Sequence, residues 1–345
     1  MASEAIKFIR ESIEDNDKSF FLYLNPTVPH GSGDVRGVLE NGDCRHSVAG
    51  NLNNPPEIPV VAPIEYDQSL DCRAYRQTVL DRASQRRPSD AELGMIWMDD
   101  AIGWIMETLF LLNELDNTFF LIQQDHGQEG KGSLYQQGVR MFQFVHYPDK
   151  IAPNTQFDGL TSTIDIGPTM LEFAGITSSP YEMDGTSWAA AAQDPGLVDS
   201  FLERCLFFEI DDERSVQCGC HAYMRLPSPD SETRIRAGTE GFDLNPGADQ
   251  LFNVCTGSGD WIYSPAANPQ VNGSTLLAVE PDILADLSAK VDCHIQNTRP
   301  AEVPSFGDCS DGGDDSDNGG GQKPCIEWQN FSVPFFSTLR KLHDG

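Results

Sequence analysis

Apolar positions near the start of the chain recur at helical spacing. Four of them within residues 5–13 predict a helix, with Ser3 as its N-cap and an end near the polar run 15–17. Residues 19–24, SFFLYL, are apolar almost without alternation, which is typical of a strand covered on both faces in a parallel sheet. The loop that follows contains two prolines and reaches His30, so we expect this histidine just beyond the end of a strand.

The next stretch changes from loop-like to helical texture. Residues 31–87 are rich in Pro, Gly and Asn and contain Cys44 and Cys72, so they predict a long surface insertion that a disulfide would staple as a lid. Regular structure is expected to resume at Ser89, which forms a capping-box pattern with Glu92. The apolar stripe that follows, to about residue 112, predicts a long crossover helix.

A second apolar run, around residues 119–122, predicts a strand that ends abruptly at Asp125-His126-Gly127. Another strand is expected over 140–147, and a short helix over 164–174, closed by a glycine suited to a helix C-terminus. Strand and helix therefore alternate through residues 1–200, as in an α/β domain. Loops beyond the C-terminal ends of such strands are where ligands bind in open α/β sheets.

Beyond residue 200 the pattern predicts a smaller α+β subdomain with an antiparallel sheet, over 201–300. Its expected elements are three short strands and a helix, at residues 205–210, 214–220, 249–254 and 281–292. Residues 301–345 form an acidic tail rich in Gly and Asp, which we expect to be largely disordered. Its low-complexity part, 308–321, does not satisfy the spacing of a calcium-binding loop.

Charge and hydropathy narrow the classes of partner. The 345 residues carry 53 acidic against 23 basic side chains, a formal net charge of −30. Such a field repels polyanions, so the composition argues against nucleic-acid binding, and an anionic substrate requires a locally basic pocket. The sequence has no apolar run long enough for a membrane span.

Cysteine usage bears on the compartment. Nine cysteines without a C-x-x-C pair favour disulfides over zinc, and the odd number leaves one thiol free or paired outside the chain. The sequons at Asn272 and Asn330 also agree with secretion, but the N-terminus has no signal-peptide pattern. The sequence thus leaves localisation open between an intracellular protein and part of a longer, secreted one.

The loop after the 119–122 strand contains three residues that could bind a metal ion or an oxyanion. Asp125 and His126 offer a carboxylate and an imidazole at a tight turn, where Gly127 allows the backbone to approach a bound ion. Lys131 stands between two glycines, which expose its ammonium group to an oxyanion. Each feature alone also fits an ordinary turn or a surface lysine.

The order of these motifs resembles the sulfatases, in the alkaline-phosphatase-like superfamily. FFLYLNPTVPHG is similar to the sulfatase strand that ends in a proline and a histidine, and the helix, DNT turn, strand and DHG of residues 97–127 resemble the helix and metal loop of the family. KGSLYQQGVR resembles the G-K-x-x-x-Y-E-G-G-x-R segment, and STIDIGPTMLEFAGI with DGTSW resembles two later blocks. DQLFNVCTGSGD resembles a strand of the C-terminal subdomain. The resemblance runs from about residue 3 to 295.

The resemblance implies a fold, a cofactor and a substrate class. The fold would be an alkaline-phosphatase-like α/β sandwich with a mostly parallel sheet, incomplete at its N-terminal side, plus the α+β subdomain. Asp125 and His126 would be ligands of a divalent metal, usually Ca²⁺, while His30 and Lys131 would contact the sulfate group, with His30 protonating the departing alcohol. The partner would be a sulfated small molecule or sulfated glycan, and the compartment secretory, lysosome-like or extracellular.

The chain also departs from the family pattern. It lacks the strand with paired aspartates and the C/S-x-P-x-R motif whose Cys or Ser becomes formylglycine, so the nucleophile is expected only in a missing N-terminal part. We therefore interpret the chain as the C-terminal portion of an arylsulfatase-like protein, inactive by itself. Gln136-Gln137 also replaces the usual Glu-Gly beside Lys131.

Three other interpretations stay open on the sequence alone. The chain is a non-catalytic protein or pseudoenzyme that binds sulfate esters, a phosphoryl-transfer relative in the same superfamily, or a disulfide-rich scaffold. The scaffold leaves the ordered DHG and GKGSLY motifs unexplained.

Overall fold

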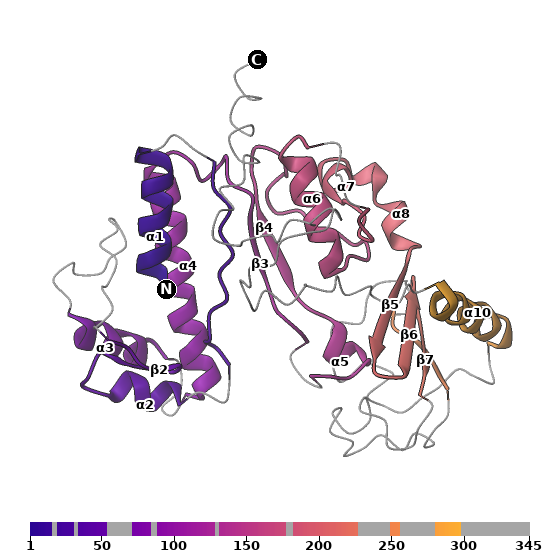
Figure 1. Ribbon diagram of the computed structural model, residues 1–345, viewed down its shortest axis with the longest axis horizontal. Coiled ribbons are helices and arrows are strands. Elements are labelled where there is room, and N and C mark those ends of the chain that lie inside the picture. Colours follow the sequence, from indigo (N-terminus) through magenta and orange to yellow (C-terminus); the bar gives the residue numbers. More distant parts are fainter. Residues whose placement is uncertain are drawn as a thin grey trace, which may run out of the picture. The chain divides into compact units, whose positions relative to one another are not determined.

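A computed structural model describes residues 1–15, 19–30, 34–53, 71–83, 88–127, 131–176, 182–226, 249–255 and 280–297 (Figure 1). The described chain divides into two compact units. The first comprises Met1–Phe120 and His146–Pro153, and the second comprises Leu121–Val145 and the described residues from Asn154 onward. The domain boundaries expected from the sequence, 1–200, 201–300 and 301–345, stay a prediction.

The first unit is helical. Its elements are α1 (Ala2–Arg10) with a π-helical turn (Glu11–Asp15), α2 (Val35–Glu40), β1 (His46–Ser47), β2 (Gly50–Asn51), α3 (Cys72–Arg82) and α4 (Asp90–Leu111). Helix α1 packs along α4, and α2 and α3 pack on α4 as well (Figure 1). The shared core contains Ile9, Val35, Val79, Leu93 and Leu109, all almost fully buried.

The predicted first helix is confirmed, but its start is different. Met1 is the N-cap of α1 and makes no side-chain capping bond, while Ser3 lies within the first turn. Ala5, Ile6 and Ile9 of the periodic stripe are buried, and Ile13 is partly buried. Burial of the stripe therefore fixes the helix without a side-chain cap.

The strand predicted over residues 19–24 is wrong, because no strand is assigned there. Phe20 and Leu22 pack on the first core, whereas Phe21 and Tyr23 are exposed, Tyr23 by 78%. The segment is extended and alternates between two environments, so it is covered on one face only. A run of apolar side chains indicates that a segment is buried, whereas a strand also needs a neighbouring strand that hydrogen-bonds to its backbone.

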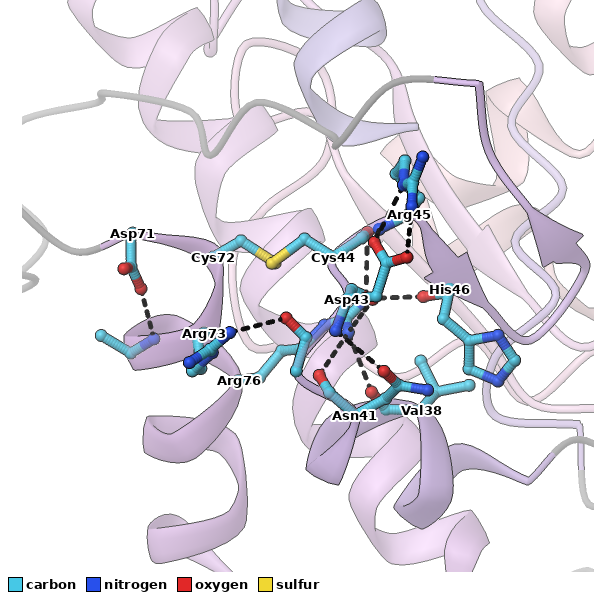
Figure 2. The surroundings of a disulfide bond; sticks show 12 residues. Val38, Asn41, Asp43, Cys44, Arg45, His46, Asp71, Cys72, Arg73 and Arg76 are labelled. Atoms are coloured by element: carbon cyan, nitrogen blue, oxygen red, sulfur yellow. Dashed lines mark hydrogen bonds and ion pairs between the residues drawn. A yellow bond between two sulfur atoms is a disulfide. The ribbon is translucent and has the colours of Figure 1, made fainter.

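The surface insertion predicted over 31–87 contains two helices that the sequence did not indicate. Helices α2 and α3 lie in it and contribute Val35, Leu39, Tyr75 and Val79 to the core of the unit. The disulfide expected in this stretch is present and joins Cys44 to Cys72 (Figure 2). The described part of the stretch is thus a packed element with its own helices.

A buried arginine organises the loop between α2 and α3. Arg76 is 2% exposed, and its guanidinium donates hydrogen bonds to five backbone carbonyl groups (Figure 2). The acceptors are the carbonyl oxygens of Val38, Asn41, Asp43, Cys44 and His46. Burial lowers the pKa of Arg76, and the carbonyl dipoles offset part of the cost of desolvating its charge.

The long helix predicted from Ser89 is confirmed as α4. The Ser89 hydroxyl accepts a hydrogen bond from the Glu92 amide, as the capping pattern requires. The helix ends before Asn113, which adopts a left-handed conformation with φ 57°. The chain then enters β3 (Phe120–Gln123), which is hydrogen-bonded to β4 (Gln143–His146), so both predicted strands are confirmed. The larger parallel sheet stays a prediction.

The second unit begins with short helices and continues into a sheet. Its helical elements are α5 (Gln136–Val139), the 3₁₀ turns Thr163–Asp165 and Pro195–Leu197, α6 (Ile166–Phe173), α7 (Ala189–Gln193) and α8 (Asp199–Leu202). Helix α6 confirms the helix predicted over 164–174. Gly175 follows it with φ 73° and donates its amide to the Glu172 carbonyl, which closes the helix as expected.

The predicted antiparallel sheet is confirmed. It contains β5 (Cys205–Ile210), β6 (Glu213–Cys218), β7 (His221–Arg225) and β8 (Gln250–Asn253), paired in this order. Helix α10 (Pro281–Asn297), which confirms the helix predicted near 281–292, packs on β6 and β7. Strand β7 was not predicted, because its sequence HAYMR mixes polar and apolar residues although three of its five side chains are buried.

The two faces of this sheet belong to different cores. Tyr223 and Leu251 pack with Leu287 and Val291 of α10 on one face. The opposite face carries a second core that includes Leu134 and Tyr135, which precede α5. The chain between β3 and β4 is therefore anchored in the C-terminal sheet.

Three disulfides join described cysteines, which agrees with the expectation of disulfides. Besides Cys44–Cys72, the pairs are Cys205–Cys218 and Cys220–Cys255. Cys293 is exposed and has no disulfide partner among the described cysteines. Among the described helices, none combines the length and apolarity needed to cross a bilayer. The tail 301–345 and both sequons lie outside the described residues.

Candidate functional site

The candidate metal ligands lie in the loop directly after β3. Asp125 is largely exposed, with 77% of its side chain accessible, and His126 is partly exposed at 31%. Their side chains turn toward each other, with 3.7 Å between His126 Nε2 and Asp125 Oδ2. One carboxylate and one imidazole are therefore available side by side at this strand end.

The His126 ring is held by its own loop. Its Nδ1 lies 2.7 Å from the Gly127 carbonyl oxygen, which accepts only, so Nδ1 carries the proton and donates. In the neutral ring this leaves Nε2 with a lone pair, on the side of Asp125. A backbone carbonyl that fixes the tautomer in this way is typical of metal-binding histidines.

Gly127 connects this loop to α5. Its amide donates to the Gly138 carbonyl at 2.8 Å, and a side chain at Gly127 would overlap the Gln137 carbonyl oxygen. Only glycine fits such a close approach of two backbones. The DHG turn and the segment after Lys131 are thus fixed to each other within the second unit.

Lys131 is exposed, and Gly132 after it adopts a left-handed conformation with φ 78°. Among the described residues, no carboxylate pairs with the Lys131 ammonium group. The chain becomes buried at once after Gly132, since Ser133 is 2% exposed and Tyr135 1%. The arrangement presents a cation on a short tether next to a rigidly packed segment.

Two residues of the sheet hold that segment and were missed in the sequence. Gln136 Nε2 donates to Gln217 Oε1 at 2.6 Å, and the Tyr135 hydroxyl donates to Gln250 Oε1 at 2.9 Å. Gln136 stands where the family pattern has Glu, so an amide pair occupies a place where a carboxylate is expected. The sequence does show Gln217 and Gln250 at core-facing positions of strands. Hydrophobic patterning assigns such polar residues to the surface, so it gave no reason to select them.

His30 belongs to the first unit. It is exposed, and its amide donates to the Thr27 carbonyl at 3.0 Å. The preceding Pro29 lies against Gly94 of α4, where a side chain would come within 2.8 Å of Pro29 Cα, so this glycine allows the loop to pack on the helix. Asp125, His126 and Lys131 belong to the second unit. The convergence of His30 with these three residues stays a prediction.

The described residues contain no group of three or more His, Cys, Asp or Glu side chains with metal-ligand geometry. A divalent ion needs four or more ligands, of which Asp125 and His126 could provide two. Their chemistry fits a cation, because the carboxylate is exposed and the Nε2 lone pair is oriented.

Comparisons with known proteins find similarity to sulfatases. Residues 124–217 match the model of the family N-sulphoglucosamine sulphohydrolase, C-terminal. The chain is 25% identical to an arylsulfatase of Clostridium perfringens over 201 residues, which cover 54% of this chain and 40% of that protein. It is 29% identical to an N-acetylglucosamine-6-sulfatase of Bos taurus over 200 residues, 54% of this chain and 34% of that protein.

A solved structure has a fold similar to that of this chain. A Bacteroides fragilis protein described as a sulfatase superposes with a TM-score of 0.54 at 16% identity, over 86% of this chain and 57% of that one. The match thus covers between about a third and a little over half of each of these three proteins.

Proposed function

We propose that the protein hydrolyses sulfate esters, on the premise that this chain is the C-terminal portion of a sulfatase in the alkaline-phosphatase-like superfamily. One observation carries the proposal: the matched segment 124–217 contains the DHG loop and Lys131 on one compact unit, and Gly127 ties the two together. The substrate would be a sulfated carbohydrate or a sulfated aryl alcohol, the two classes that the relatives' names give.

In this proposal Asp125 and His126 hold a divalent cation, and we propose Ca²⁺. The exposed carboxylate and the oriented Nε2 support a metal site. The ion would supply positive charge beside the oxygens of the ester. Calcium prefers oxygen ligands and imidazole suits transition metals, so the identity of the ion is the part of the proposal that most needs measurement.

Lys131 would bind the sulfate group as a compact cation. Its exposed ammonium group, without a described carboxylate partner, is free to pair with an oxyanion. His30 would donate a proton to the departing alcohol, so that ester and water yield an alcohol and a sulfate ion. The family's nucleophile, a formylglycine, has no counterpart in these 345 residues, and the proposal requires that it come from outside this sequence.

The three disulfides support a protein that matures in an oxidising compartment. We propose the secretory pathway, with a lysosome-like or extracellular destination. A relative from Drosophila melanogaster is named an extracellular sulfatase.

Lys131→Ala tests the proposed reaction. In the complete enzyme we expect kcat to fall by at least ~100-fold, because removing one preorganised group that stabilises a developing oxyanion lowers the rate by about this factor. The melting temperature should stay within a degree or two, since the side chain is exposed. Assays on a sulfate and a phosphate ester of the same alcohol measure both turnover and the class of substrate.

The matched control is Lys7→Ala, which removes an exposed lysine of α1. It should leave kcat unchanged. Full turnover in Lys131→Ala would remove this lysine from the mechanism, and preference for the phosphate ester would place the protein among the phosphoryl-transfer relatives.

A further inference from the structure

Two glutamines of the C-terminal sheet face the segment that carries Lys131. In the β6–β7 register Gln217 lies opposite Ala222, and in the β7–β8 register Gln250 lies opposite Met224. Directly opposite residues share a face of the sheet. Ala222 and Met224 belong to the core that also contains Leu134 and Tyr135, so both glutamines point toward this segment.

The contacts that result are buried and specific. Gln136 donates to Gln217 at 2.6 Å and Tyr135 to Gln250 at 2.9 Å, and all four residues are at most 8% exposed. Buried polar side chains with satisfied partners restrict their rotamers, and losing one partner leaves the other unpaired. The two bonds therefore fix consecutive residues of the segment at two points on the sheet.

The Gln217 amide is itself held in orientation. Its Nε2 donates to the Gly219 carbonyl at 3.4 Å, which leaves Oε1 as the acceptor for Gln136. Gly219 has φ 48° and lies between Cys218 and Cys220, which are bonded to Cys205 and Cys255. Two covalent cross-links thus flank the turn on which the acceptor depends.

We propose that Gln217 and Gln250 are positioning residues, which act through Gln136 and Tyr135 to fix the place of Lys131. This inference rests on the proposed sulfate-binding role of Lys131. Only Gly132 separates the lysine from the buried Ser133, and glycine by itself does not restrain a tether. The restraint on the ammonium group therefore comes from the segment that the sheet holds.

Gln217→Leu tests the inference, because leucine keeps most of the side-chain volume and removes the acceptor. In the complete enzyme, with a sulfated aryl ester as substrate, we expect kcat to fall ~10- to 100-fold, since a small displacement of a positioned group has this effect. KM should change by less than about threefold, because the interaction is strongest in the transition state. Gln250→Leu should act in the same direction.

Two further variants separate positioning from stability. Ser215→Ala removes a buried hydroxyl from the same strand and face, where it donates to the Tyr223 carbonyl, and should leave kcat unchanged. Gln136→Met removes the donor to Gln217 Oε1 and should lower kcat to the same extent as Gln217→Leu.

Hydrogen exchange of residues 131–136 gives a readout that does not need turnover. It should be faster in Gln217→Leu than in Ser215→Ala at equal global stability. Wild-type kcat in Gln217→Leu, with Lys131→Ala inactive, would overturn the inference and leave the proposed function standing. An equal loss in Ser215→Ala would also overturn it. A wild-type enzyme inactive on sulfate esters would refute the proposed function, and exchange alone would then decide whether the sheet fixes this segment.

Discussion

At the scale of single residues, Asp165 shows how a charge is buried in this protein. It is 0% exposed, and its carboxylate accepts bonds from the Ser162 and Thr186 amides and from the Arg204 guanidinium. The sequence placed Asp165 in a family block, but its ion-pair partner lies 39 residues further along the chain. Such a pair is invisible to local patterns, because charge complementarity at that separation depends on the fold.

Asp165→Ala should lower the free energy of unfolding by about 3–5 kcal/mol, because it leaves the Arg204 guanidinium and two amides without their acceptor. Urea denaturation monitored by circular dichroism measures the loss. Asp212→Ala, at an exposed position between β5 and β6, is the control and should cost less than ~0.5 kcal/mol. Equal midpoints for the two variants would show that the buried pair contributes no stability.

At the scale of elements, apolar periodicity identified α1, α4, α6, α10 and most of the C-terminal sheet. It missed α3, whose buried residues are Tyr75, Arg76 and Val79. A pattern that treats arginine as exposed cannot place Arg76 in a core, where five backbone carbonyl groups of α2 and the following loop accept hydrogen bonds from its guanidinium. The strand prediction for residues 19–24 failed because apolar side chains alone do not supply the hydrogen-bonded neighbour that a strand needs.

The Cys44–Cys72 disulfide should stabilise the α2–α3 element through the unfolded state. Closing a loop of 28 residues restricts the unfolded chain by about 3–4 kcal/mol in the chain-entropy estimate. The double variant Cys44→Ser, Cys72→Ser should therefore unfold at lower urea concentration by an amount of this order. Cys293→Ser, which breaks no described disulfide, is the control. Peptide mapping of the unreduced protein checks the pairing, and reduced cysteines at 44 and 72 would contradict the proposed compartment.

At the scale of the whole molecule, the family motifs identified candidate site residues that the apolar pattern of single segments did not indicate. The motifs placed Asp125, His126 and Lys131 on loops beyond β3, and the structure brings these loops together through Gly127 and α5. The sequence did not reveal that the C-terminal sheet holds the Lys131 segment, because Gln136 and Gln217 are 81 residues apart. Contacts of that kind follow from topology, which single-strand periodicity does not encode.

The proposed metal site would need further ligands, because Asp125 and His126 would supply only two and the described residues contain no larger group of candidate ligands. Dialysis against EDTA should abolish turnover and lower the melting temperature, since a bound ion stabilises the folded state by mass action. Addition of Ca²⁺ should restore both the turnover and the melting temperature.

Asp125→Asn should need at least ~10-fold more Ca²⁺ than wild type to restore turnover, since losing one charged ligand weakens binding. The control Asp116→Asn, at an exposed position before β3, should need the same Ca²⁺ concentration as wild type. Restoration by Mn²⁺ or Zn²⁺ but not by Ca²⁺ would keep the site and correct the ion, in agreement with the imidazole ligand. Full activity in metal-free protein, verified by mass spectrometry of the elements, would refute the metal role of Asp125 and His126.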